Sequence, residues 1–213
     1  VSNSISCNLS GSSTADKTVN TLTLKQDIVV YVDDAPFSIF DSNDPNNTAP
    51  ITITLPAGCS ALVIEDGMLK PSGNFATGTY TIKVLQVAND YFQASGELTT
   101  TVTVKKHTPE VTWNLPQLYF GQTYDNPITT NSDGALNITS SGVGASILHI
   151  DVSNSTIEVD PLTEGEYAVT FTVSLAASDL FEAFTKTYNA IIYRDPRHLR
   201  VDVNSLAVYQ AVT

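Results

Sequence analysis

The heptapeptide ANDYFQA, residues 88–94, returns 89 positions later as ASDLFEA, residues 177–183. Ala, Asp, Phe and Ala keep their places, and the three other positions carry mild substitutions. A repeat with a spacing of roughly 80 to 90 residues constrains this chain more than any single motif, because it predicts two copies of one structural unit.

The similarity extends to both sides of the heptapeptide. In each copy a Gly-x-Tyr turn opens an alternating run before the motif, at 77–87 and at 164–175. A second alternating run follows the motif, at 97–106 and at 187–194. Alternation of polar and apolar residues is typical of strands with one buried face, so each copy is predicted to end in two successive strands.

Each copy also has a strand, a turn and a strand upstream, at 62–71 and at 148–161. About seven short runs separated by Gly, Pro, Asn and Asp turns are typical of an immunoglobulin-like sandwich. The fold class is therefore predicted to be all-β, with two tandem immunoglobulin-like β-sandwich domains and strand-like terminal extensions. Five aromatic residues are expected in the cores: Tyr80, Phe92, Trp113, Tyr167 and Phe181.

The two ends of the chain resemble parts of further copies. Residues 17–26, KTVNTLTLKQ, are similar to the closing strand at 99–107, and residues 199–212 lie in register with the opening strand at 111–124. The expected organisation is an N-terminal strand extension (1–25), a first domain (26–105), a second domain (106–194) and a C-terminal strand extension (195–213).

Composition argues against several classes of function. The net charge of −12 and the pI of about 4.3 disfavour nucleic acid and anionic membrane surfaces. The sequence contains no apolar run of about 18 residues, the length expected of a membrane span. It begins with Val1 and not with Met, so we expect a processed product or an excised fragment from which any signal peptide has been removed. Cys7 and Cys59 suit one disulfide in an oxidising compartment, within the chain or between chains, and free thiols are the alternative.

The Gly-x-Tyr strand openings and the head-to-tail spacing resemble the immunoglobulin-like repeats of prokaryotic cell-surface proteins. Together with the strand-like extensions and the acidic chain, they also resemble the subunits of archaeal surface threads and pili. That resemblance implies an extracellular filament in which a terminal strand of one subunit completes a sheet of the next.

A spare strand exposes backbone N–H and C=O groups that can pair with another chain. If donor and acceptor lie at opposite ends of the subunit, such pairing is heterologous and grows a head-to-tail homopolymer. The expected donor residues are Thr18, Val19, Thr21, Leu22, Thr23 and Leu24, and the rival donor is the run of Leu199, Val201, Val203 and Val208. The alternative function is a piece of a longer repeat array that serves as a cell-surface stalk or adhesin.

Other sites are expected to be minor. An acidic stretch could offer oxygen ligands to Ca²⁺, although turn formation is favoured and no metal or other cofactor is expected; it includes Asp33, Asp34, Asp41, Asn43 and Asp44. Four sequons could carry N-linked glycans, at Asn8, Asn46, Asn137 and Asn154. Three lysines could enter isopeptide bonds, but a solvated role is favoured for Lys17, Lys25 and Lys83.

Enzymatic function is not expected. The three histidines, His107, His149 and His198, are scattered, and no nucleophile elbow or metal-ligand pair accompanies them. A carbohydrate-stacking strip is conceivable at Tyr119, Phe120 and Tyr124, but packing within the domain is favoured there.

Overall fold

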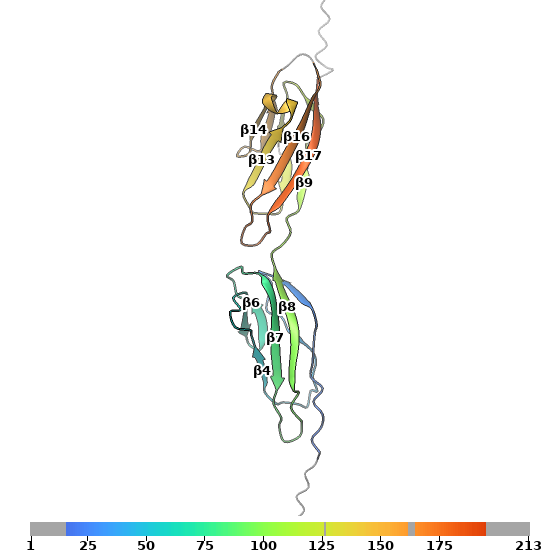
Figure 1. Ribbon diagram of the computed structural model, residues 1–213, viewed down its shortest axis with the longest axis vertical. Helices are drawn as coiled ribbons and strands as arrows, with labels where there is room; N and C mark the ends of the chain where they lie inside the picture. Colours follow the sequence, from blue (N-terminus) through green and yellow to red (C-terminus); the bar gives the residue numbers. More distant parts are fainter. Residues whose placement is uncertain (1–15, 126, 162–164, 195–213) are drawn as a thin grey trace, which may run out of the picture. The chain divides into compact units, whose positions relative to one another are not determined.

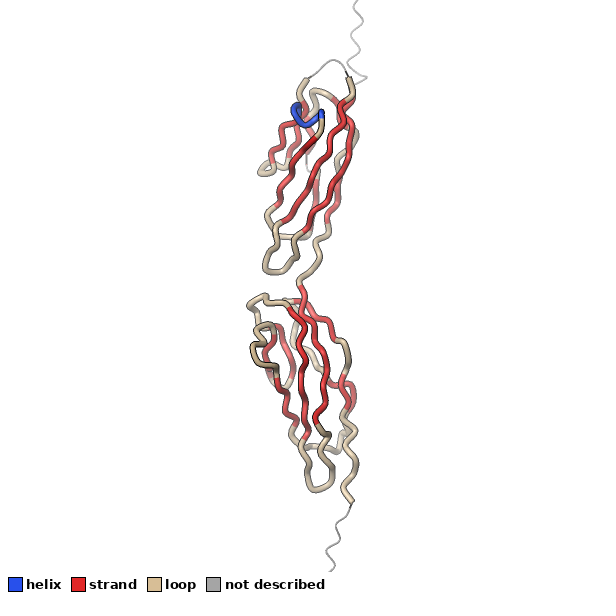
Figure 2. The backbone as a smooth tube through the Cα atoms, in the orientation of Figure 1, coloured by secondary structure: helices blue, strands red, loops and turns tan. Residues whose placement is uncertain are grey.

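The computed structural model describes residues 16–125, 127–161 and 165–194. The chain divides into two compact units, unit 1 (Val1–Lys105) and unit 2 (Lys106–Thr213). Nearly all of the regular structure is β-strand, and the one helical segment drawn in Figure 2 is a short 3₁₀ turn. The prediction of an all-β chain with two immunoglobulin-like sandwiches is confirmed.

The strands described in unit 1 are β1 (Thr23–Leu24), β2 (Ile28–Tyr31), β3 (Phe40–Ser42), β4 (Ile51–Thr54), β5 (Leu62–Glu65), β6 (Met68–Pro71), β7 (Gly78–Gln86) and β8 (Glu97–Lys105). One layer is a four-stranded sheet in the order β2-β8-β7-β4 (Figure 1). The other layer contains the pairs β1-β3 and β5-β6, which are linked by a bridge between Phe37 and Leu69.

The elements described in unit 2 are β9 (Val111–Trp113), β10 (Leu118–Tyr119), β11 (Thr123–Asp125), β12 (Ile128–Thr130), β13 (Leu136–Ser141), η1 (Val143–Ile147), β14 (Leu148–Asp151), β15 (Thr156–Val159), β16 (Tyr167–Leu175) and β17 (Phe184–Tyr193). Its four-stranded sheet has the order β10-β17-β16-β13. The opposite layer contains β11-β15-β14 and the pair β12-β9.

The two units share one topology. In each unit the last two strands form a long antiparallel hairpin, β7-β8 and β16-β17. In each unit a short strand near the start lies parallel to the last strand, β2 beside β8 and β10 beside β17. The strand-turn-strand segments expected upstream are the hairpins β5-β6 and β14-β15. The sequence repeat therefore corresponds to a repeat of the fold.

The Gly-x-Tyr motif has a steric cause in both units. Gly78 and Gly165 have φ values of +154° and +101°, which favour glycine. A Cβ on Gly78 would lie 2.9 Å from Tyr80 Oη, and a Cβ on Gly165 would lie 2.9 Å from Tyr167 Cε2. The tyrosine ring folds back over the glycine two positions earlier, so a side chain at the glycine would collide with it.

The cores are mainly aliphatic. Ile82, Val102 and Leu69 are fully buried in unit 1, and Phe171 is the largest fully buried side chain in the described residues. Of the five aromatic residues expected in the cores, Phe92 is buried, whereas Tyr80, Trp113, Tyr167 and Phe181 are half-buried. Trp113 still packs on the core, because its ring stacks on Tyr188 at 4.6 Å and meets Phe171 at 5.2 Å.

Unit 1 contains a buried amide network that unit 2 replaces with apolar packing. The last residue of β7, Gln86, is 0% exposed. Its Oε1 accepts hydrogen bonds from Asn20 Nδ2 (3.0 Å) and Asn47 Nδ2 (3.2 Å), and its Nε2 donates to the Ala49 carbonyl (3.0 Å). The corresponding last residue of β16 is Leu175, which is also buried but has no hydrogen-bonding group in its side chain. The network ties the incoming chain at Asn20 to the sheet of unit 1.

Candidate functional site

The repeated heptapeptide forms the bend between the last two strands of each unit, and it holds the chain that enters that unit. In unit 1 the Thr18 N–H donates to the Tyr91 carbonyl (2.8 Å), and the Gln93 N–H donates to the Thr18 carbonyl (2.9 Å). Thr18 thus pairs with Phe92 as a parallel bridge. We call this contact between the bend and the incoming chain the bend clamp.

Unit 2 repeats the bend clamp at the same spacing. The His107 N–H donates to the Leu180 carbonyl (2.8 Å), and the Glu182 N–H donates to the His107 carbonyl (2.9 Å). His107 follows Thr18 by 89 positions, and its bridge partner Phe181 follows Phe92 by the same number. The His107 and Phe181 rings are also in contact, with centroids 5.7 Å apart.

A lysine directly before the bridged residue reinforces each clamp. Lys17 Nζ donates to the Asn89 carbonyl (2.6 Å), and Lys106 Nζ donates to the Ser178 carbonyl. The lysines are 89 positions apart, as are the two residues that accept their hydrogen bonds. An ammonium group on a carbonyl is a charge-assisted hydrogen bond, which is stronger than a neutral one.

The substitution of Ser for Asn within the heptapeptide preserves one contact. Asn89 Oδ1 accepts the Phe92 N–H at 2.8 Å, and Ser178 Oγ accepts the Phe181 N–H at 3.1 Å. Both side chains place an oxygen three residues before the N–H that they bind, as Asx and Ser/Thr turns do. The variable position of the motif is therefore constrained to residues with a short oxygen-bearing side chain.

The expected donor strand is corrected by these contacts. Leu22 and Leu24 are 5% and 9% exposed within unit 1, and β1 pairs with β3 of the same unit. The remaining expected donors, Thr18, Val19, Thr21 and Thr23, lie on the same segment with exposed side chains, and Thr18 is held by the bend clamp. The segment 16–25 is the opening segment of the first sandwich, because alternating leucines fill the core of their own unit.

The rival donor residues Leu199, Val201, Val203 and Val208 lie outside the described residues, and so do Cys7, Asn8 and His198. Cys59 is half-buried in the loop between β4 and β5. The predicted disulfide is therefore not tested.

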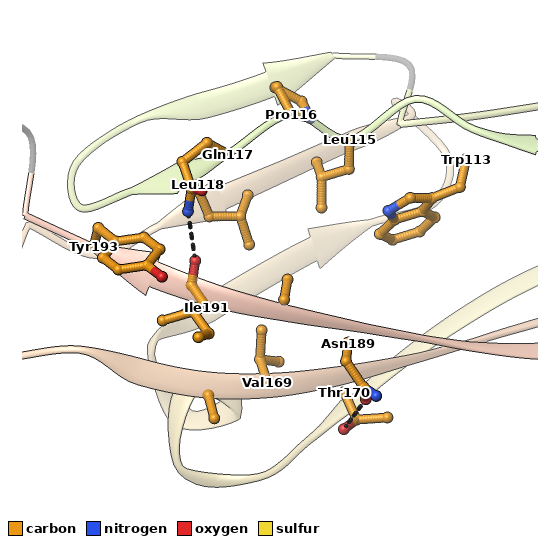
Figure 3. A pocket seen from close by; sticks show the side chains of 12 residues that line it. Trp113, Leu115, Pro116, Gln117, Leu118, Val169, Thr170, Asn189, Ile191 and Tyr193 are labelled. Carbon is orange, nitrogen blue, oxygen red and sulfur yellow. Dashed lines mark hydrogen bonds between the residues drawn. The ribbon is translucent and has the colours of Figure 1, made fainter.

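An apolar groove lies beside β17 in unit 2. It has a volume of about 550 Å³ and is bordered by the segment between β9 and β10 and by β16 and β17. Figure 3 shows Leu115, Pro116 and Leu118 on one side and Val169 and Ile191 on the other. The rest of the lining consists of Trp113, Gln117, Ala168, Thr170, Asn189, Ala190 and Tyr193, and none of the lining residues is charged.

The groove forms because β10 covers only the end of β17. The two strands pair at Ile192 and Tyr193, and the Phe120 N–H extends the ladder to the Tyr193 carbonyl (3.0 Å). Ahead of this point Gln117 Nε2 donates to the Ile191 carbonyl (3.0 Å), a contact drawn in Figure 3. Pro116 has no N–H and cannot add a ladder bond there.

Unit 1 closes the corresponding gap with hydroxyl groups. Thr100 Oγ1 donates to the Lys25 carbonyl at 2.5 Å, and Thr101 Oγ1 donates to Asp27 Oδ1 at 2.9 Å. Thr100 pairs with Ile82, which lies two positions after Tyr80 in β7. In unit 2, Ala190 pairs with Val169, which lies two positions after Tyr167 in β16, so Ala190 corresponds to Thr100. Ala190 has no hydroxyl that could bind the neighbouring segment, so the groove stays open at this place.

The acidic residues of the suggested calcium stretch act in turns. Asp34 Oδ2 accepts the Tyr31 N–H (2.8 Å), and Asp44 Oδ1 accepts the Asn46 N–H (2.8 Å). Asp41 Oδ2 lies 3.4 Å from Thr23 Oγ1. Within 16–125, 127–161 and 165–194, no three His, Cys, Asp or Glu side chains are grouped so that they could hold a metal ion.

The three sequons in the described residues have exposed asparagines: Asn46, Asn137 and Asn154. Asn154 differs from the others because its Nδ2 donates to Asp151 Oδ2 (2.7 Å). Hydrogen bonds from the Ser153 side chain and then from Asn154 hold the pKa of the Asp151 carboxyl below its ordinary value. The nitrogen that a glycan would modify is therefore already engaged in this turn.

The lysines suggested for isopeptide bonds and the histidine His149 make hydrogen bonds or ion pairs with other groups. Lys25 Nζ donates to the Ser38 carbonyl (3.0 Å), and Lys83 pairs with Glu97 at 2.8 Å, so neither lysine meets an Asn or Asp side chain in these contacts. His149 lies 2.9 Å from Asp160 on the surface.

The suggested carbohydrate strip packs within unit 2. Phe120 is buried, Tyr119 is half-buried, and Tyr124 Oη accepts the Tyr119 N–H (2.7 Å).

Comparisons with known proteins give no family. No family model matches the chain, and no curated protein matches it. Among solved structures, the chain is similar to human mucin-like protocadherin EC1-2, with 14% identity, a TM-score of 0.33, and coverage of 80% of this chain and 96% of that one. It is also similar to mouse cadherin-23 EC22-24 (14% identity, TM-score 0.34, coverage 81% and 64%) and to Drosophila N-cadherin EC1-3 (14%, 0.32, 82% and 66%).

At these identities and TM-scores the likeness carries no inference about what the chain does. The resemblance to archaeal threads and pili remains a prediction. No helix in the described part of the chain is long and apolar enough to cross a membrane.

The placement of residues 18–24 in unit 1 predicts a local stability effect. Leu22→Ala should lower the free energy of unfolding of unit 1 by about 2–5 kcal/mol, because it removes a buried side chain. Val19→Ala is the matched control, since Val19 is 66% exposed, and it should change the value by less than about 0.5 kcal/mol. Urea denaturation followed by circular dichroism measures the effect, with Trp113 fluorescence reporting unit 2 separately. Unchanged stability in Leu22→Ala would refute the placement.

Proposed function

We propose that the chain is a structural segment of an extracellular protein, in which immunoglobulin-like units are joined in series as a spacer or adhesive array at a cell surface. The bend clamp is the observation that carries this proposal. Both units bind their incoming chain with the same two backbone hydrogen bonds and a lysine at the same spacing. A contact that recurs at each junction is what a serial array requires.

The connection between the units supports the same function. Lys105 is the last residue of β8, and His107 is already bound in the clamp of unit 2, so only Lys106 lies between them. Flexible linkers consist of many Gly and Ser residues, and this connection has neither. Successive units are thus joined without a free linker, as in tandem repeat proteins.

Surface chemistry favours an extracellular setting. The net charge of −12 keeps a protein soluble in crowded surroundings and disfavours nucleic acid as a partner. Two exposed sequon asparagines, Asn46 and Asn137, offer glycan acceptors on unit surfaces. The proposed role is mechanical and adhesive.

The proposal is tested on cells that produce the protein. Antibodies raised against the described sandwiches should label intact, unpermeabilised cells, and the epitope should disappear when the cells are treated with an external protease. In the native extract the epitope should lie on a polypeptide with a mass much greater than 22.8 kDa, as a repeat array requires. Labelling that appears only after permeabilisation would contradict an extracellular role.

A second candidate, a filament joined by strand donation, is favoured by the groove of unit 2. The groove offers an uncharged apolar channel beside an incompletely covered edge of β17, and edges of this kind bind extended chains. The N-terminal segment is occupied in its own unit, so the candidate donor is the C-terminal run of Leu199, Val201 and Val203 from another copy. Alternate apolar side chains would enter the groove while the backbone pairs with β17.

Sedimentation of the full chain tests the filament directly. Strand donation into the groove predicts dimers or larger assemblies whose mass grows with concentration, and predicts monomers when residues 195–213 are deleted. Val201→Asp on the donor and Ala190→Leu in the groove should each abolish polymerisation, while Thr187→Ala on the exposed face of β17 should not. A full chain that stays monomeric at all concentrations would exclude the filament and leave the serial array.

A further inference from the structure

The strands that connect each unit to the rest of the chain lie parallel to one another. In unit 1 the chain enters at the bend clamp, passes through β2 and leaves at the far end of β8. In unit 2 it enters at the second bend clamp, passes through β10 and leaves at the far end of β17. In Figure 1 the bend and the exit of each unit lie at opposite ends of its last strand.

This geometry determines how a unit responds to tension. When the two ends of the chain are pulled apart, two parallel terminal strands are drawn past each other in opposite directions. All the hydrogen bonds between them are then loaded together, instead of opening one after another as in a hairpin pulled from its ends. The rate of forced unfolding therefore depends on how many bonds join the two strands.

The two units differ in the ladder between these parallel strands. In unit 1, β2 and β8 are paired at four positions, from Ile28↔Val102 to Tyr31↔Lys105, and the Val32 N–H adds a bond to the Lys105 carbonyl (3.0 Å). In unit 2, β10 and β17 are paired at two positions, and the Phe120 N–H adds the corresponding bond to the Tyr193 carbonyl.

Side chains increase the difference. The Thr100 and Thr101 hydroxyls bind the segment that leads into β2, so they share the load in unit 1. In unit 2 Ala190 has no such group, and Gln117 supplies one side-chain bond from the long segment that borders the groove. The groove is thus the place where the load-bearing edge of unit 2 is least supported.

We infer that the two units differ in mechanical stability, and that unit 2 unfolds at a lower pulling force than unit 1. A pull along the chain first separates β10 from β17 and unfolds unit 2, which lengthens the chain while unit 1 remains folded. This goes beyond a spacer of fixed length, because the same segment extends in two steps at two forces.

Single-molecule pulling on the full chain, with handles at its two ends, tests the inference. Six Gly/Ser residues inserted at the exposed Asp66–Gly67 turn label unit 1, because they add about 20 Å to its unfolding extension. The unlabelled event should come first, at a mean force lower by up to about twofold, in keeping with the number of bonds loaded together. The inference is wrong if the labelled event comes first or if both events share one force distribution.

A pair of isosteric variants identifies the ladder as the cause. Thr100→Val and Thr101→Val together keep the side-chain volumes and remove both hydroxyl contacts, so the force of the labelled event should fall towards that of unit 2. Thr99→Val is the matched control on the exposed side of β8, and it should leave the force unchanged. An equal loss of force in the control, or no loss in the double variant, would show that the hydroxyl contacts do not bear the load.

Discussion

The structure depends on one contact made twice: the bend between the last two strands of a unit binds the backbone of the chain that enters it. The two hydrogen bonds at Thr18 and the two at His107 join the first described residues of each unit to its last hairpin. These residues are about 75 positions apart in sequence, so the contact closes each sandwich across nearly its full length. Because the contact is made through backbone groups, it tolerates threonine in one unit and histidine in the other.

The clamp explains why the heptapeptide repeats more faithfully than the strands around it. A strand position needs only an apolar or polar residue on the correct face, and many residues satisfy that requirement. The bend must place carbonyl groups for a lysine and for a backbone N–H, and it needs a side-chain oxygen at Asn89 or Ser178 to hold its own shape. Conditions on backbone geometry therefore leave a stronger signal in the sequence than conditions on burial.

Much of the fold followed from these patterns. The alternation on each side of the heptapeptide predicted the hairpins β7-β8 and β16-β17, and the Asp- and Gly-rich turns predicted β5-β6 and β14-β15. The expected core aromatics were less accurate. Phe171 was missed because it stands in an ordinary alternating run, and only burial by both layers distinguishes it.

The role of residues 18–24 could not be read from their alternation. A strand that fills its own sandwich and a strand that fills a neighbour's have the same pattern of apolar residues, and only the pairing partner differs. The match to the closing strand at 99–107 rested on shared Thr, Val and Lys residues, whereas the informative match was Lys17-Thr18 with Lys106-His107. The groove left no positive signal, since it arises from a missing hydroxyl at Ala190 and a missing N–H at Pro116.

Amide hydrogen exchange in a dilute, monomeric sample tests the central claim most directly. If each bend binds the incoming chain of its own unit, the N–H groups of Thr18, Gln93, His107 and Glu182 exchange far more slowly than in an unfolded peptide. Val19 beside them, a residue that is 66% exposed, serves as the reference for solvent access. Exchange at the free-peptide rate at Thr18 and Gln93, with the rest of unit 1 protected, would contradict the account.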